Sequence, residues 1–293
     1  MTARLDAPVL ALVDGSAPAA NAAWRAALVA RDHRVPLRLL HSGAAGGEHD
    51  APRLAAALRE RLVITVETPP CEGDPLTHAV RAAREASLLV IGSRRGNPLR
   101  EFVLGTQAER LLRLCRGPVL VVKRPVTAGY RRVLVPVDLG AEASHVIATA
   151  GLFSRDPRME VLHALRLDAE ATLRLADASH EVLRRQRGTA EVRARLSLQE
   201  LIADAGAGPN GARLAVTFGD AAASVLARER AMRADLVVLG KRQRGMLADF
   251  FLGGVTQRVL AAARADVLIV VTPAQAGARG AEASGRRPLV REA

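Results

Sequence analysis

The sequence repeats itself, because a series of short motifs in its first half recurs in the same order in its second half. An apolar run that ends in aspartate occurs at Val9–Asp14 and again at Val133–Asp138. The further pairs are Leu39–His41 with Val161–His163, Gly73–Asp74 with Gly219–Asp220, Leu89–Gly92 with Val237–Gly240, Leu104–Gly105 with Leu252–Gly253, and Val119–Val122 with Val267–Val270. Such a repeat in 293 residues predicts two domains of one fold rather than a single larger one.

Each copy alternates short apolar runs with longer amphipathic segments, which is the pattern of β-α-β units on a parallel sheet. The runs consist mainly of Val, Leu and Ile, as strands that are buried on both faces require. The fold class expected is α/β, with two tandem domains that each hold a five-stranded parallel sheet with helices on both faces. We predict strands at residues 8–14, 37–41, 62–67, 87–92 and 118–123, and at 132–138, 160–164, 213–218, 235–240 and 266–271.

Local signals place the helices. Helices are expected after Ser16 and Asp50, and Asp74–Pro75 predicts a helix start, because aspartate caps helices and proline suits their first position. The second copy has a longer helical stretch, Asp168–Ala205.

The domain boundaries follow. Domain 1 is predicted at 1–124, shortened between its second and third strands, and domain 2 at 130–272. The link Arg124–Arg131 is too short for a flexible tether, so the halves should touch. Their closing strands, 119–122 and 267–270, would lie at sheet edges and pair with each other, giving an intramolecular pseudo-dimer and making a homodimer optional. Residues 273–293 lack periodicity, which predicts a disordered tail.

Composition excludes several classes of function. The net charge is +12, but 40 of the 42 basic residues are arginines spread along the chain, which favours a solvated surface over nucleic-acid binding. The longest apolar runs are far shorter than the roughly 20 residues of a membrane-spanning helix. Asp6 and Asp14 bracket the N-terminal apolar run, which argues against a secretory signal, so we expect a cytoplasmic protein. Cys71 and Cys115 form no CxxC motif, and the histidines form no metal-binding pattern.

A ligand site is expected where the strand order of an open parallel sheet reverses. In the first copy, Asp14 at the end of the first strand would lie near the loop that begins at Gly92. In the second copy, Asp138 would lie near the loop that begins at Gly240. That loop ends at a glycine that opens a helix, and a helix N-terminus binds phosphate. Taken alone, each aspartate could equally cap the next helix, and structural hydrogen bonds are the simpler interpretation of His41 and His163. Neither a GxSxG motif nor a P-loop occurs, so we expect no enzyme and only slow, incidental ATP hydrolysis.

At these residues the chain resembles the universal stress protein family, in a tandem arrangement over residues 7–124 and 130–272. Nucleotide-binding members of that family carry a Gly, two residues, a Gly, nine residues, a Gly and then Ser or Thr. The first copy has Gly92-Ser93-Arg94-Arg95, nine residues, and Gly105-Thr106, so arginine replaces the second glycine. The second copy has Gly240-Lys241-Arg242-Gln243, nine residues, and Gly253-Gly254, which lacks both the second glycine and the hydroxyl, with Thr256 two positions late.

The resemblance implies a Rossmann-like fold of the adenine-nucleotide α-hydrolase type and a regulatory role in stress response. It implies that ATP or a related adenine nucleotide, with Mg²⁺ only as its counterion, binds in domain 1, where Arg95 would cost affinity unless its guanidinium pairs with phosphate. The alternative is a nucleotide-free interaction or scaffold module of the same fold. The implied ligand residues are Leu12, Val13, Asp14, His41, Gly92, Ser93, Arg94, Arg95, Gly105, Thr106 and Gln107, with a weaker second site at Val137, Asp138, Gly240, Lys241, Gly253 and Gly254.

Overall fold

The computed structural model of the chain describes residues 5–41, 50–71, 73–93, 111, 114–115, 117–153, 159–166, 180–207, 211–242 and 254–272. The first half contains β1 (Val9–Val13), α1 (Ala17–His33), β2 (Leu37–His41), α2 (Asp50–Leu62), β3 (Val66–Glu67), α3 (Pro75–Arg84), β4 (Leu88–Gly92) and β5 (Val119–Val122). The second half contains β6 (Val133–Pro136), α5 (Ala143–Phe153), β7 (Met159–Leu165), α7 (His180–Asp204), β8 (Ala212–Phe218), α8 (Ala221–Met232), β9 (Leu236–Arg242), α9 (Gly254–Ala262) and β10 (Asp266–Thr272).

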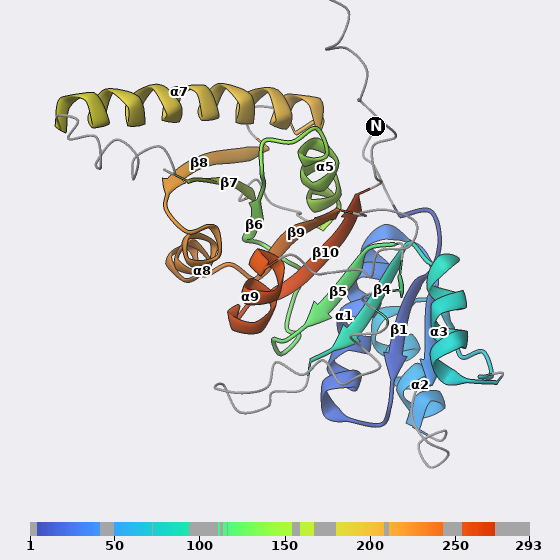
Figure 1. Cartoon of the computed structure of the whole chain (residues 1–293). Helices are drawn as coiled ribbons and strands as arrows, with labels where there is room; N and C mark the ends of the chain where they lie inside the picture. The colour runs from blue at the N-terminus through green and yellow to red at the C-terminus, as the bar shows by residue number, and fades with distance from the viewer. Residues whose placement is uncertain are drawn as a thin grey trace, which may run out of the picture.

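Within the described residues ten strands form one sheet, in the order β3-β2-β1-β4-β5-β10-β9-β6-β7-β8. Figure 1 labels β1 and β4 to β10 of this sheet. Each half is a five-stranded parallel sheet, and the order of the second half mirrors that of the first. The halves join where β5 and β10 pair antiparallel, with Leu120 opposite Leu268. The predicted fold class is therefore confirmed, and so is the predicted pairing of residues 119–122 with the closing strand of the second copy.

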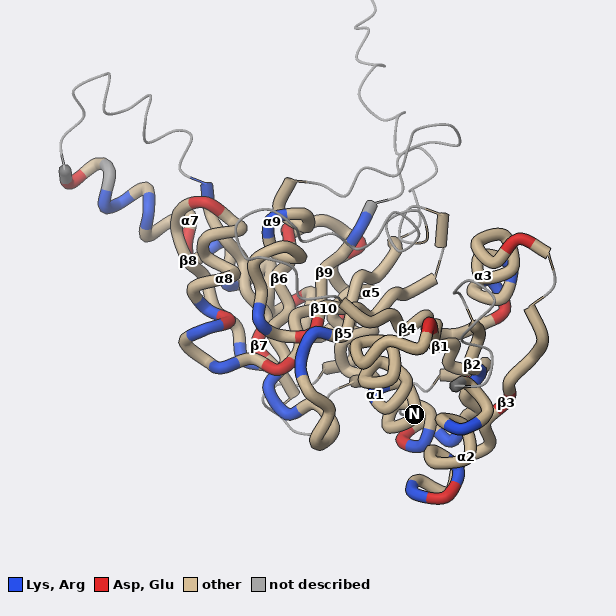
Figure 2. Tube along the Cα trace, turned by 90° about the horizontal axis from the view of Figure 1, so that it is seen from below, with Lys and Arg blue, Asp and Glu red and all other residues tan. Residues whose placement is uncertain are grey.

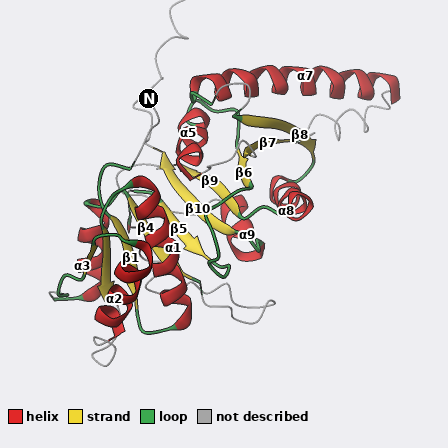
Figure 3. Ribbon diagram, turned by 180° about the vertical axis from the view of Figure 1, so that it is seen from behind, coloured by secondary structure: helices red, strands yellow, loops and turns green. Residues whose placement is uncertain are grey.

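Both faces of the sheet are covered by helices, as Figures 1 and 3 show. Alternate strand residues point to opposite faces, so Val9 belongs to one apolar layer and Leu10 to the other. Helices α1, α2, α5 and α7 contribute to the first layer, and α3, α8 and α9 to the second. The strands are buried on both sides, which explains their nearly uninterrupted apolar sequences.

Two predicted helix starts agree with the structure. Ser16 caps α1, with its Oγ accepting a hydrogen bond from Ala19 N, and Asp74 caps α3, with Pro75 in the first turn. Asp50 is the first described residue of α2. The helix predicted over residues 168–205 corresponds to α7, and its first part lies outside the described residues.

The strand predicted at residues 62–67 is wrong over most of its length. Helix α2 continues to Leu62, and the backbone N–H of Val63 still bonds to the carbonyl of Arg59. Val63 has φ +52° and is 90% exposed, so it ends the helix rather than entering the sheet. Only Val66–Glu67 pairs with β2, because Leu58 and Leu62 already anchor this segment as a helix.

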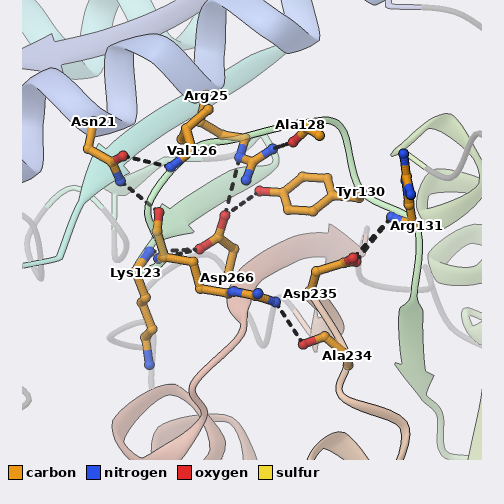
Figure 4. A network of polar contacts seen from close by, with 11 residues as sticks. Asn21, Arg25, Lys123, Val126, Ala128, Tyr130, Arg131, Ala234, Asp235 and Asp266 are labelled. Atoms are coloured by element: carbon orange, nitrogen blue, oxygen red, sulfur yellow. Dashed lines mark hydrogen bonds and ion pairs between the residues drawn. The ribbon is translucent and has the colours of Figure 1, made fainter.

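The link between the halves runs through a buried polar network, shown in Figure 4. Asp266, at the start of β10, is fully buried and accepts hydrogen bonds from the backbone N–H groups of Lys123 and Arg124, at 2.8 and 2.9 Å. Its other oxygen accepts the Tyr130 hydroxyl at 2.7 Å. Asn21 bonds both to the carbonyl of Arg124 and to the N–H of Val126. The predicted contact between the halves is therefore confirmed.

Charged residues are distributed over the whole of the described fold. Figure 2 shows basic residues in both halves, with acidic residues among them. Among the described helices, none combines the length and the apolar character needed to cross a membrane.

Candidate functional site

A cavity of about 480 Å³ lies in the second half, at the carboxyl ends of β6, β7 and β9. The strand order reverses here, because the chain leaves β6 toward β7 and β8 and returns to β9 on the other side of β6. Ligands of open parallel sheets bind at this position, and the volume is within the range of small-molecule sites. Most of the wall is apolar, with side chains that include Val137, Val146, Leu162, Val225, Leu239 and Val255.

Three helices begin at this cavity. Ala143 at the start of α5, Ala221 at the start of α8 and Val255 at the start of α9 all contribute to its wall. The first N–H groups of a helix have no partner within the helix, and they carry a partial positive charge. The Asp220 carboxylate already caps α8, so the cavity is suited to an anionic group placed near the N-termini of α5 and α9.

Polar side chains of the cavity come from several elements. Asp138 follows β6, and Arg166 follows β7. The Nδ1 atom of His163 lies 2.9 Å from the carbonyl oxygen of Val137, the kind of structural hydrogen bond expected for this histidine. A ring whose Nδ1 donates to that carbonyl leaves Nε2 as an acceptor when neutral.

Helices α8 and α9 are tied together beside the cavity. Asp220 caps α8 by accepting a hydrogen bond from Ala223 N at 2.9 Å. The same carboxylate accepts two hydrogen bonds from Arg258 of α9, at 3.0 and 2.9 Å. The Arg258 side chain, followed by the Ala223 N–H, lowers the pKa of Asp220, so this carboxylate stays ionised near neutral pH.

The structure brings together three of the residues predicted for the second site, because Val137, Asp138 and Gly240 all line the cavity. Gly240 is needed for packing, since a Cβ there would lie 2.9 Å from Cγ2 of Val146. Lys241 is buried, and its carbonyl accepts a hydrogen bond from the Thr272 hydroxyl at 3.1 Å. Gly254 begins α9, and Gly253 and Gln243 lie outside the described residues.

Sequence reasoning missed four polar residues of the cavity wall, namely Glu142, Arg166, Thr256 and Thr272. By the spacing of the phosphate-binding motif, Thr256 stands two positions too late. Thr256 lies in the first described turn of α9, which spans Gly254–Ala262, and it lines the cavity. The start of the helix, rather than the count from the last glycine, is the signal that could have found it.

In the first half, several predicted residues surround the equivalent end of the sheet. Leu12 and Val13 are buried in β1. Asp14 Oδ1 accepts hydrogen bonds from the N–H and the hydroxyl of Ser16, at 3.0 and 2.5 Å, so it supports the capping residue of α1. Ser93 follows β4, and its N–H bonds to the carbonyl of Val122.

Two more first-half residues have a defined environment. Gly92 is fixed by sterics, since a Cβ there would lie 2.5 Å from the carbonyl oxygen of Pro18 in α1. Both ring nitrogens of His41 are buried without a hydrogen-bond partner in the described structure. The structural hydrogen bonds expected for His41 are therefore absent there. Arg94, Arg95, Gly105, Thr106 and Gln107 lie outside the described residues.

The described part of the chain contains no group of three or more His, Cys, Asp or Glu side chains that could hold a metal ion.

The fold and the cavity define a class of proteins: tandem Rossmann-like α/β domains that share one sheet and hold a cavity at a switch point. A family model described as "Universal stress protein family" matches residues 7–123 and 129–271. The chain therefore belongs to the universal stress protein family, with two such domains in tandem.

Solved structures show the same fold. A universal stress protein from Archaeoglobus fulgidus DSM 4304 aligns with 90% of this chain and 98% of its own, with a TM-score of 0.62 and 18% identity. A protein of unknown function from Pseudomonas aeruginosa PAO1 aligns with 90% of this chain and 92% of its own, with a TM-score of 0.66 and 22% identity. Comparison with curated proteins found no significant match.

Proposed function

We propose that this chain is a cytoplasmic regulatory protein of the stress response that binds an adenine nucleotide without rapid turnover. The observation that carries the proposal is the cavity of about 480 Å³ in the second half, where three helix N-termini face one mostly apolar space. An adenine ring matches the apolar wall, and phosphate groups match the helix N-termini.

We assign each of three polar residues of the cavity to a different part of the nucleotide. Asp138 offers a carboxylate that accepts hydrogen bonds from ribose hydroxyls. Thr256 supplies a hydroxyl in the first turn of α9, and Arg166 supplies a cation for phosphate oxygens. In this arrangement Thr256 replaces the hydroxyl that the motif places directly after Gly253.

The proposal also includes a nucleotide site in the first half of the chain. Its described residues are Leu12, Val13, Asp14, His41, Gly92 and Ser93, in the domain predicted at residues 1–124. The buried, unpartnered ring nitrogens of His41 support it, because a ligand group would satisfy them. With residues 130–272 as the other domain, the expected stoichiometry is one or two nucleotides per chain.

Calorimetric titration of the purified chain with ATP tests the proposal. Asp138→Asn removes a charge-assisted hydrogen bond worth roughly 1.5 to 3 kcal/mol, so we expect the Kd of the second site to rise about ten- to a hundredfold. The matched control is Asp204→Asn, an exposed residue at the end of α7, which should leave the Kd unchanged.

Asp14→Asn reports on the first-half site in the same titration. If the wild-type chain shows no heat of binding and carries no nucleotide in native mass spectrometry, the nucleotide proposal fails. The chain would then act as an interaction module of the same fold.

A further inference from the structure

Lys123 belongs to the first half, where it follows β5, but its side chain ends in the second half. Its Nζ donates hydrogen bonds to the carbonyl oxygens of Leu260 and Ala263, the second at 3.0 Å. In Figure 4 the side chain points away from the Asp266 carboxylate, which is bound instead by the Lys123 backbone N–H. The last carbonyls of a helix have no partner within the helix, and a cation there also interacts favourably with the helix dipole. Lys123 therefore caps the C-terminus of α9.

The chemistry of this contact suits a lysine. The chain has only two lysines among its 42 basic residues, so arginine is its usual cation. An ammonium group is compact and directs three donors at nearby oxygens, whereas a guanidinium is a planar fork. The last turn of α9 has no basic residue of its own, so the cation comes from the other half of the chain.

Helix α9 connects this contact to the cavity. It has nine residues, and at 1.5 Å per residue it is about 14 Å long. Its first turn places Val255 and Thr256 in the cavity wall, while its last turn meets Lys123. A rigid secondary element of this kind can carry coupling between the groups at its two ends.

The turn that follows α9 is held by a buried glutamate. Glu229, at the end of α8, is buried and accepts hydrogen bonds from the N–H groups of Arg264 and Ala265, both at 2.9 Å. Asp266 comes next, and its Oδ1 accepts hydrogen bonds from the backbone N–H groups of Lys123 and Arg124. The C-terminal end of α9 is thus fixed relative to the first half, and its N-terminal end faces the ligand cavity.

We propose that Lys123 is a positioning residue for the second-half cavity: by anchoring the C-terminus of α9, it sets where Thr256 and the first N–H groups of that helix meet an anionic ligand. The affinity of the second half for its ligand then depends on a side chain of the first half. This inference rests on the proposed function.

The test uses the full chain with Lys123→Met, which keeps the length of the side chain and removes the cation. We expect the Kd for ATP at the second site to rise about five- to tenfold, within the range of coupling between distant sites. Hydrogen exchange of the α9 amides should be faster than in the wild type. Lys123→Arg keeps the charge without the compact geometry. We therefore expect its Kd for ATP to lie between those of the wild type and Lys123→Met.

Tyr130→Phe is the matched control. It removes a hydrogen bond to Asp266 across the same interface but does not touch α9. It should lower the stability of the chain, leave the ATP affinity unchanged, and speed exchange in α9 no more than in the other helices.

Three results would overturn the inference. They are an unchanged Kd in Lys123→Met, an equal loss of affinity in Tyr130→Phe, and unchanged exchange in α9. A wild-type chain that binds no ATP overturns the proposed function together with the ligand part of the inference. The exchange measurement then decides on its own whether Lys123 positions α9.

Discussion

Arg25 in α1 and Asp266 in β10 come from opposite halves of the chain, and the Nε atom of Arg25 lies 3.3 Å from Oδ2 of Asp266. Both side chains are buried, at 6% and 0% exposure. The guanidinium also lies 4.2 Å from the centre of the Tyr130 ring and donates to the carbonyl of Ala128 at 2.6 Å. One buried ion pair thus fixes the link between the halves against the first helix.

Removing Asp266 should cost more stability than any exposed ion pair provides. In Asp266→Ala the Arg25 cation is left buried without its partner, so we expect a loss of about 3 to 5 kcal/mol in urea unfolding. Arg185→Ala, which breaks the exposed pair with Glu181 on α7, should cost less than about 0.5 kcal/mol. Similar losses in the two variants would show that the network contributes little.

Two glycines should respond to alanine in opposite directions. In Gly92→Ala the new Cβ would meet the α1 backbone 2.5 Å away, so we expect a loss of about 2 to 3 kcal/mol. Gly151 lies within α5, and a Cβ added there would meet no atom within 4 Å, so Gly151→Ala should gain about 0.5 to 1 kcal/mol through better helix propensity. Thermal unfolding of both variants checks this, and a stable Gly92→Ala would contradict the tight packing.

The buried thiol of Cys115 should make stability fall at alkaline pH. Burial raises its pKa from 9.0 to about 11. Between these values the unfolded chain has lost the thiol proton while the folded chain keeps it, so the free energy of unfolding decreases by up to about 1.4 kcal/mol per pH unit. Cys115→Ala lacks this effect. The stability of the wild type minus that of the variant should therefore decline from pH 9 to pH 11, and a constant difference would refute the assignment.

The buried ammonium group of Lys123 should make stability rise with pH, which is opposite to the effect of Cys115. Burial lowers its pKa from 10.5 to about 8, although Glu229 and Asp266 partly oppose the shift. Between pH 8 and 10.5 the folded chain has lost a proton that the unfolded chain still holds, so this group makes stability rise with pH. Denaturant unfolding of the wild type and Lys123→Met across this range checks the sign. A difference that stays constant or falls with pH would contradict a lowered pKa of Lys123.

Much of the fold could be predicted because its signals are local or repeated. Buried parallel strands need continuous apolar runs, and caps such as Asp74 act within a few residues. The prediction at residues 62–67 failed because Leu62 suits a helix and a strand equally, and the packing of α2 decided between them. Short apolar runs carry no period that separates the two structures.

The site was predicted only in part. Asp138 and Gly240 follow strands whose ends meet at one edge, so their place in the cavity wall follows from the strand pattern. Thr256 and Arg166 depend on where α9 begins and on how far β7 extends, which are set by packing against neighbouring elements.

The sequence alone determined the number of domains, their sheet and the edge of the sheet at which the second-half cavity lies, because hydrophobic periodicity and a duplicated pattern specify these directly. The tertiary structure alone showed that Lys123 caps α9 and that Asp266 holds Arg25, Tyr130 and the link together. These partners lie more than 100 residues apart in the chain. Which polar group meets which across such a distance depends on how the two halves dock, and no local pattern encodes that geometry.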